Sequence, residues 1–186
     1  MRRRAGYSGG AGVGGTEDGE GKALNISIKA ALLAAVIAAG GVSGQVAELA
    51  EAAVYEKAES NISEKDVEMC AKLVWGEARG CTETEQSAVI WCVLNRVDAG
   101  YGGIAEVITA RGQFYGYRAS NPVTDELYEL AEDVLTRYYL EKSGVSGAGR
   151  TLPKDYLWFT GDGRHNYFRN EYRGGTYWDW SLPSPY

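Results

Sequence analysis

The chain contains Trp75-Gly76-Glu77-Ala78-Arg79-Gly80 between two segments that have the hydrophobic spacing of α-helices. Gly80 is of the residue type that most often ends a helix, so the hexapeptide marks the passage from one helix to the next. A carboxyl group held against apolar surface, such as the indole of Trp75, keeps its proton more tightly because a low dielectric penalises the charged form. Glu77 is therefore a candidate general acid. The alternative is an ordinary exposed glutamate at a glycine-capped helix end.

The segment before the hexapeptide carries the signals of a helix that begins near Ser63. Ser63 followed by Asp66 resembles a capping box. The apolar residues then recur at helical spacing, and Glu77 extends their face by three residues. That face consists of Val67, Cys70, Ala71 and Val74. A carboxylate that continues an apolar stripe is one that folding tends to bury.

The segment after the hexapeptide predicts a central helix over residues 83–98. Thr82 and Glu85 form a second capping box, and the following residues are apolar on more than one side. Two further helices are expected over residues 104–110 and 124–142, the second with an apolar stripe.

The composition changes after Pro153 and predicts a hairpin. Tyr156-Leu157-Trp158-Phe159 and Asn166-Tyr167-Phe168 are strand candidates on either side of the turn residues Gly161-Asp162-Gly163-Arg164. The expected fold class is α+β, mostly helical, with a small antiparallel sheet or hairpin near the C-terminus.

Composition and charge exclude several classes of function. The 186 residues have a formal net charge of −6, and basic residues are scattered apart from three arginines at residues 2–4, so a nucleic-acid partner is not expected. One histidine and three cysteines lack the spacing of zinc ligands, and we expect no metal and no cofactor. Cys70, Cys81 and Cys92 are expected either as reduced thiols or as one pair formed after export with one thiol left over.

The N-terminal part of the chain divides into three segments. Residues 1–29 are polar and Gly-rich and are expected to be disordered. Residues 30–43 hold an apolar run shorter than the roughly 20 residues of a membrane span. This run fits the hydrophobic region of a signal peptide, and the alternatives are a weak membrane anchor or an Ala-rich helix of a soluble protein. Residues 44–62 are expected as a linker with some helical character, followed by the folded domain at residues 63–186.

Short motifs follow one another in order over residues 66–180: Glu77-Ala78-Arg79-Gly80, Val93-Leu94-Asn95-Arg96-Val97, Gly112-Gln113-Phe114, Trp158-Phe159 and His165-Asn166. Their order and spacing resemble the SleB-type cell wall hydrolases, a family that includes spore-cortex-lytic enzymes. The resemblance implies a lysozyme-like fold and cleavage of the bond between N-acetylmuramic acid and N-acetylglucosamine in peptidoglycan. It also implies that Glu77 is catalytic and that residues 63–186 are the catalytic domain. Many members have an acidic residue directly after the first motif, where this chain has Cys81.

The carboxylates favour one particular mechanism. A glycosidase usually uses two carboxyl groups, but Glu83 and Glu85 are explained by helix capping and Asp162 by its turn. A single acid fits a lytic transglycosylase, in which the C6 hydroxyl of the substrate replaces water and one residue acts first as acid and then as base. The resemblance agrees, because such enzymes release a 1,6-anhydro sugar.

The candidate substrate-binding residues are mainly aromatic. The chain has 13 Tyr and 5 Trp, and such rings stack on sugar faces, although core packing explains them equally well. Gln113 is a candidate contact to an N-acetyl group or a sugar hydroxyl, and Arg79 to the muramyl carboxylate or stem peptide. The aromatic candidates are Phe114, Tyr115, Trp158 and Tyr167. Asn95 and Arg96 are expected to be structural. His165 could donate to the glycan, but the expected role is a structural hydrogen bond on the hairpin.

Other functions stay open at this point. They are a hydrolytic muramidase, a cysteine peptidase or amidase that uses Cys81 with His165, and a non-catalytic glycan-binding domain. The expected partner is the peptidoglycan strand, and we expect a monomer. The protein is expected to be exported to the cell wall, or held at the membrane through its N-terminal apolar segment with the catalytic domain outside.

Overall fold

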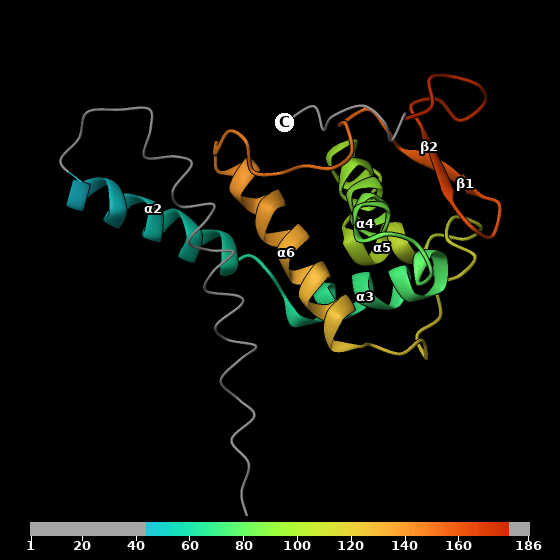
Figure 1. The fold of residues 1–186 in the computed structure, drawn as a ribbon, viewed down its shortest axis with the longest axis horizontal. Coiled ribbons are helices and arrows are strands. Elements are labelled where there is room, and N and C mark those ends of the chain that lie inside the picture. Colours follow the sequence, from blue (N-terminus) through green and yellow to red (C-terminus); the bar gives the residue numbers. More distant parts are fainter. Residues whose placement is uncertain (1–43, 179–186) are drawn as a thin grey trace, which may run out of the picture. The chain divides into compact units, whose positions relative to one another are not determined.

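The computed structural model describes residues 44–178, with side chains from Leu49 onward. The elements are α2 (Gly44–Glu59), α3 (Glu64–Ala78), α4 (Glu83–Asp98), α5 (Ile104–Thr109), α6 (Asp125–Lys142), β1 (Trp158–Gly161) and β2 (Asn166–Arg169) (Figure 1). Helices dominate, and β1 and β2 form a small antiparallel sheet. This confirms the expected α+β, mostly helical class with a hairpin near the C-terminus.

Contacts place a boundary between two units of the chain at Ala47 and Glu48. The elements from α3 to β2 belong to the second unit. The predictions for residues 1–29 and 30–43 fall outside the described residues. Between residues 44 and 178, no helix combines the length and apolar character that crossing a membrane requires.

The helices begin where the sequence predicts. Ser63 accepts a hydrogen bond from the Asp66 backbone N–H at 3.1 Å, and Thr82 accepts one from the Glu85 backbone N–H at 3.4 Å. Each cap satisfies one of the N–H groups that the first turn of a helix leaves without a partner. The two caps fix the residues at which α3 and α4 begin.

Helix α4 is the centre of the core, as its apolar sequence predicts. Every residue from Ala88 to Leu94 is fully buried, and the helix contacts α3, α5 and α6. The ring of Trp91 packs edge-on against Tyr138, and the guanidinium of Arg150 lies 4.1 Å from its centroid. Burial of one large apolar side chain stabilises by about 1.5–3 kcal/mol, which explains why a helix that is apolar on several sides lies in the middle.

The hairpin has an inner and an outer face. Phe159 pairs with Phe168, and both rings belong to the core side of the sheet. The neighbouring pairs point to the outer face, because side chains alternate along a strand. Those pairs are Trp158 with Arg169 and Thr160 with Tyr167.

The first strand begins two residues later than the sequence predicts. Tyr156 and Leu157 lie outside β1 because α4 uses their carbonyls: Asn95 donates to the Tyr156 oxygen at 2.9 Å and Arg96 to the Leu157 oxygen at 2.6 Å. Both α4 residues are buried. This places Asn95 and Arg96 in the structural role that was expected of them.

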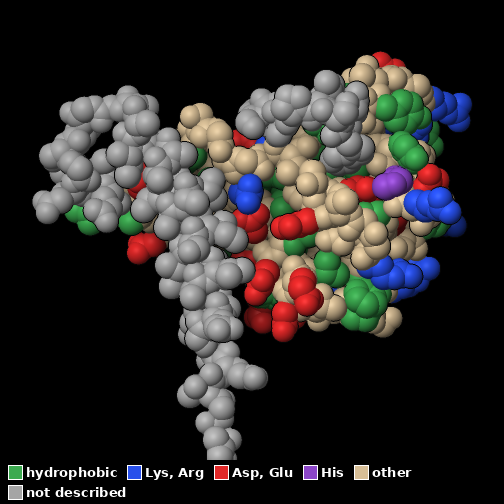
Figure 2. All heavy atoms as spheres, viewed as in Figure 1, with side chains coloured by type: hydrophobic (Ala, Val, Ile, Leu, Met, Phe, Trp, Pro, Cys, Tyr) green, Lys and Arg blue, Asp and Glu red, His purple; other side chains and the backbone are tan. Residues whose placement is uncertain are grey.

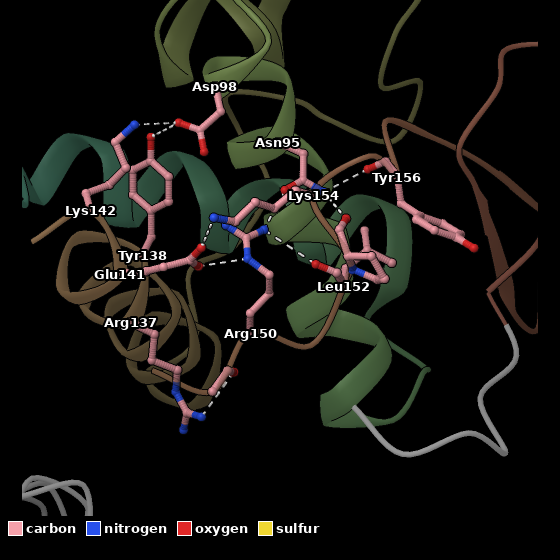
Figure 3. A network of polar contacts seen from close by, with 12 residues as sticks. Asn95, Asp98, Arg137, Tyr138, Glu141, Lys142, Arg150, Leu152, Lys154 and Tyr156 are labelled. Atoms are coloured by element: carbon pink, nitrogen blue, oxygen red, sulfur yellow. Dashed lines mark hydrogen bonds and ion pairs between the residues drawn. The ribbon is translucent and has the colours of Figure 1, made fainter. Parts of the chain in front are cut away.

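A buried polar network joins the segment before the hairpin to α4 and α6 (Figure 3). Arg150 donates to Glu141 at 2.8 Å and to the side-chain oxygen of Asn95 at 2.6 Å, while Asn95 donates to the Pro153 oxygen at 2.7 Å. Lys154 adds a second ion pair to Glu141 at 2.5 Å. Because buried polar groups need partners, this network holds the chain after α6 in one path.

Residues 44–62, expected as a linker with some helical character, are helical over most of their length, as α2. Ala58 near the end of α2 is buried against Leu140 and Ala148, with Val54 and Tyr55 packed beside it. This small cluster is separate from the main core around α4.

Candidate active site at the end of helix α3

Glu77 lies in the last turn of α3 and is half-buried. Its Oε1 accepts a 2.5 Å hydrogen bond from the backbone N–H of Gly116. Burial raises the pKa of Glu77, and the opposing effects of the Gly116 N–H and the Arg118 guanidinium do not cancel that rise. The negative end of the helix dipole also disfavours a charge here. Glu77 is therefore a carboxyl group that keeps its proton to a higher pH than an exposed glutamate.

Two glycines allow the Gly116 N–H to reach Glu77. A Cβ on Gly76 would lie 2.0 Å from the Gly116 carbonyl oxygen, and a Cβ on Gly116 would lie 2.3 Å from the Gly76 oxygen. Asn121 holds the two segments together, because its Nδ2 donates to the carbonyls of Lys72 and Gly116, both at 2.9 Å. The chain after α5 is thereby held against the turn that carries Glu77.

Side chains from α4 and β2 satisfy the last carbonyls of α3. Gln86 donates to the Ala78 oxygen at 3.2 Å, and Asn166 donates to the Glu77 oxygen at 3.2 Å. A helix leaves its final carbonyls without intrahelical partners, so these bonds close the end of α3. They also attach the hairpin directly to the residue that carries the candidate acid.

A second carboxylate, Glu85, attaches the hairpin to the first turn of α4. Glu85 is 4% exposed, one of its oxygens accepts the backbone N–H of Asn166, and the other lies 3.2 Å from Nδ1 of His165. The sequence predicts only a capping role for Glu85. Its backbone N–H does bind Thr82, but its carboxylate turns to partners 80 and 81 residues further along the chain.

Two of the predicted binding residues, Gln113 and Phe114, are held by Arg96. The Arg96 guanidinium donates to the Gln113 side-chain oxygen at 2.9 Å and lies 4.8 Å from the centroid of Phe114. Gln113 is exposed. Phe114 is buried and packs against Phe159 with ring centroids 6.0 Å apart. Phe114 is therefore a core residue of this fold, whereas Gln113 is accessible to a ligand.

The two aromatic candidates of the hairpin lie on its outer face. Trp158 is partly exposed and packs edge-on against Tyr172, and Tyr167 donates its hydroxyl to Asp162 at 2.9 Å. The side chain that contacts the Glu77 carbonyl, Asn166, belongs to the inner face. Trp158 and Tyr167 are thus directed away from the hairpin face that contacts α3.

The remaining predicted residues, Tyr115 and Arg79, are both exposed. Arg79 lies two residues after Glu77 in the chain, and Tyr115 lies in the loop whose Gly116 binds Glu77. Tyr115 directly precedes Gly116 and is 78% exposed. Arg79 folds back on its own helix: it donates to the Trp75 oxygen at 3.3 Å and lies 5.9 Å from the Trp75 ring centroid. Of the six predicted binding residues, Tyr115, Gln113 and Arg79 are the ones that the structure leaves accessible on the loop and helix end around Glu77.

Cys81 does not have the environment of a nucleophile. All three cysteines are free thiols. Burial, followed by the neighbouring carboxylates Glu85 and Asp162, raises the pKa of Cys81 to about 11, whereas a reactive cysteine has a lowered pKa. Its Sγ lies 3.5 Å from the Arg164 carbonyl oxygen. Over residues 44–178, no group of His, Cys, Asp and Glu side chains is arranged to hold a metal ion.

Comparison of the chain with protein-family models, with curated proteins and with solved structures found no match. The candidate site therefore rests on its own residues.

Proposed function

We propose that this protein cleaves peptidoglycan glycan strands between N-acetylmuramic acid and N-acetylglucosamine, with Glu77 as the single general acid and base of a lytic transglycosylase. The observation that supports the proposal is the half-buried carboxyl group of Glu77, which has a raised pKa. It lies at the end of α3, where side chains from α4 and β2 bind the last carbonyls. The motif resemblance implies a lysozyme-like fold, and this fold is part of the proposal.

The hydrogen bond from Gly116 gives the two carboxyl oxygens of Glu77 different roles. Oε1 accepts the Gly116 N–H, so Oε2 is the oxygen that carries the proton. In the proposed reaction Oε2 donates this proton to the glycosidic oxygen as the bond from that oxygen to C1 of the muramyl residue breaks. The positive charge that develops at C1 is stabilised by the substrate's own N-acetyl group.

The same carboxyl group then acts as the base. Deprotonated Glu77 takes the proton of the C6 hydroxyl while the C6 oxygen forms a bond to C1, which gives a 1,6-anhydro muramyl end and restores the acid. Atoms balance without a water molecule. The exposed Gln113 and Tyr115 are proposed to bind the sugars on the loop side of Glu77, and Arg79 the muramyl or stem-peptide carboxylate.

The contacts of two neighbouring carboxylates, Glu85 and Asp162, support a single-acid mechanism. Glu85 binds Asn166 and His165 with its two oxygens. Asp162 accepts the N–H groups of Arg164 and His165 and the Tyr167 hydroxyl, and these bonds lower its pKa to about 2. Both groups are engaged in holding the hairpin, so neither is free to act as the second carboxyl of a hydrolase.

The experiment that tests the mechanism is mass spectrometry of muropeptides released from purified cell walls. The proposal predicts anhydro-muramyl ends from the wild type and from Cys81→Ala. Purely reducing ends would instead identify a hydrolytic muramidase. Loss of release in Cys81→Ala alone would identify a cysteine peptidase or amidase, and wall binding without release by any variant would identify a binding domain.

The location of the protein is part of the same proposal. Its substrate lies outside the cell membrane, so we propose that the chain is exported or anchored with its catalytic domain outside. Fractionation of cells that express the full chain tests this directly.

A further inference from the structure

His165 has an exposed side chain, and both its backbone and its ring contact carboxylates. Its backbone N–H donates to Oδ1 of Asp162 at 2.8 Å, and its carbonyl accepts the Asp162 N–H at 3.1 Å. Its ring nitrogen Nδ1 lies 3.2 Å from the carboxylate of Glu85. The imidazole is nevertheless 61% exposed, whereas the Glu85 side chain is 5% exposed. As the one histidine of the chain, it is visible at the molecular surface among acidic and basic side chains (Figure 2).

The pairing with Glu85 determines what the other ring nitrogen can do. A carboxylate only accepts hydrogen bonds, so Nδ1 carries the proton of the neutral ring and Nε2 is left as the acceptor. A buried carboxylate that fixes the tautomer and orientation of an imidazole is the arrangement that prepares histidine for contact with a substrate. In the described part of the chain no hydrogen bond is formed by Nε2.

The pair also lies at the end of α3 that carries the candidate acid. Asn166, the residue after His165, donates its backbone N–H to Glu85 and its side-chain amide to the Glu77 carbonyl at 3.2 Å. One residue thus connects the imidazole, the buried carboxylate and the helix end. Besides Glu85, the carboxyl group next to His165 is that of Asp162, and the nearby thiol is Cys81.

We propose that Glu85 and His165 form a carboxylate–imidazole pair that presents Nε2 of His165 to a sugar hydroxyl of the bound glycan. This inference rests on the proposed function and adds a binding residue to it. His165 contacts the glycan, and Glu85 is a positioning residue that sets the tautomer of His165.

The test is ¹⁵N NMR of the full chain, in which the one histidine needs no assignment. The Glu77→Gln variant binds glycan without turnover, and the probe is a soluble tetrasaccharide of alternating N-acetylglucosamine and N-acetylmuramic acid. At pH 8.5, where imidazoles are ordinarily neutral, we expect a protonated Nδ1 and an unprotonated Nε2. Saturation with the tetrasaccharide is expected to shift the Nε2 resonance and leave Nδ1 protonated. An Nε2 resonance that stays in place at saturation overturns the proposal.

Variants separate positioning from simple structural support. In Glu85→Gln the amide oxygen can still accept the Asn166 N–H, but the amide nitrogen donates to Nδ1, so the proton moves to Nε2. We expect Glu85→Gln and His165→Gln, each added to Glu77→Gln, to weaken binding by a similar factor of roughly three to ten. The variant that combines Glu85→Gln and His165→Gln is expected to bind the glycan no more weakly than either single change. Additive losses would show that Glu85 acts without His165 and would overturn the pair.

Glu83→Gln is the matched control, because Glu83 is an exposed carboxylate in the same turn of α4. It is expected to leave the tautomer and the affinity unchanged. If Glu85→Gln fails to fold, His165→Gln with unchanged affinity still overturns the proposal. Release of muropeptides by the wild type is measured separately, so cleavage without an Nε2 contact refutes only the pair, and an Nε2 contact without cleavage refutes only the proposed reaction.

Discussion

Gly116 crosses Gly76 so closely that neither residue has space for a side chain. This backbone contact aligns the Gly116 N–H with the carboxyl group of Glu77, one residue along α3. The hydrogen bond and the burial of Glu77 therefore depend on two positions that carry no functional group of their own.

Substitution of either glycine by alanine is expected to destabilise the fold and the site together. In Gly76→Ala the gain of about 1 kcal/mol in helix propensity is outweighed by a Cβ placed 2.0 Å from a backbone oxygen. Overpacking of this kind costs about 1–3 kcal/mol. Chemical denaturation and the rate of muropeptide release measure the two effects. Gly80→Ala is the control, because a Cβ on Gly80 meets nothing within 4 Å, and an equal loss in this variant would contradict the account.

Glu77→Gln is expected to raise stability at neutral pH while it abolishes activity. The pKa of Glu77 is raised by burial, so its contribution to stability is present below the unfolded-state pKa and is lost as the pH rises through the folded-state pKa. A neutral glutamine avoids that loss and can still accept the Gly116 N–H. Thermal unfolding should show a higher Tm for the variant at pH 7 and a difference that disappears toward pH 4. A lower Tm of the variant throughout would contradict the raised pKa of Glu77.

The alkaline side of the pH–rate profile should depend on the charge of Arg118. As a general acid Glu77 loses activity when the pH rises through its pKa, and the Arg118 guanidinium lowers that pKa. Arg118→Gln is therefore expected to move the descending limb of kcat to higher pH. Arg118→Lys keeps the charge and should leave the limb close to that of the wild type. A limb that stays fixed in both variants would mean that another group titrates.

The two ion pairs of Glu141 should contribute differently to the free energy of unfolding. Arg150 is 2% exposed and also binds Asn95, so Arg150→Met leaves buried polar groups without a partner and should cost about 3–5 kcal/mol. The Lys154 side chain is 61% exposed, and Lys154→Met should cost roughly 0–1 kcal/mol. Urea denaturation of both variants measures this, and equal losses would refute the distinction.

Local sequence signals predicted the parts of the fold that depend on local interactions. The caps at Ser63 and Thr82 bind residues three positions away, and the apolar surface of α4 is a property of one segment. The start of β1 was predicted two residues too early, because Asn95 and Arg96 take carbonyls that a strand pattern assigns to the sheet.

The candidate site could be predicted only in part, because most of its contacts join residues that are far apart in the chain. Glu77 was found because it continues an apolar helix face beside an indole. The partners that hold it lie far away in the chain: Gly116 is 39 residues from Glu77, and Asn166 is 89. Phe114 is a candidate glycan contact from its sequence because it is aromatic, but its ring completes the core between Arg96 and Phe159. Periodicity identifies a buried face without identifying what covers it.

The most direct test of the central claim is the release of soluble muropeptides from purified cell walls by the wild type and by Glu77→Gln at equal concentration of folded protein. A general acid contributes roughly 10²–10⁴-fold to the rate. We expect release by the wild type and a loss of that size in Glu77→Gln, with its fold and wall binding retained. Release by Glu77→Gln at the rate of the wild type would contradict the assignment of Glu77 as the proton donor.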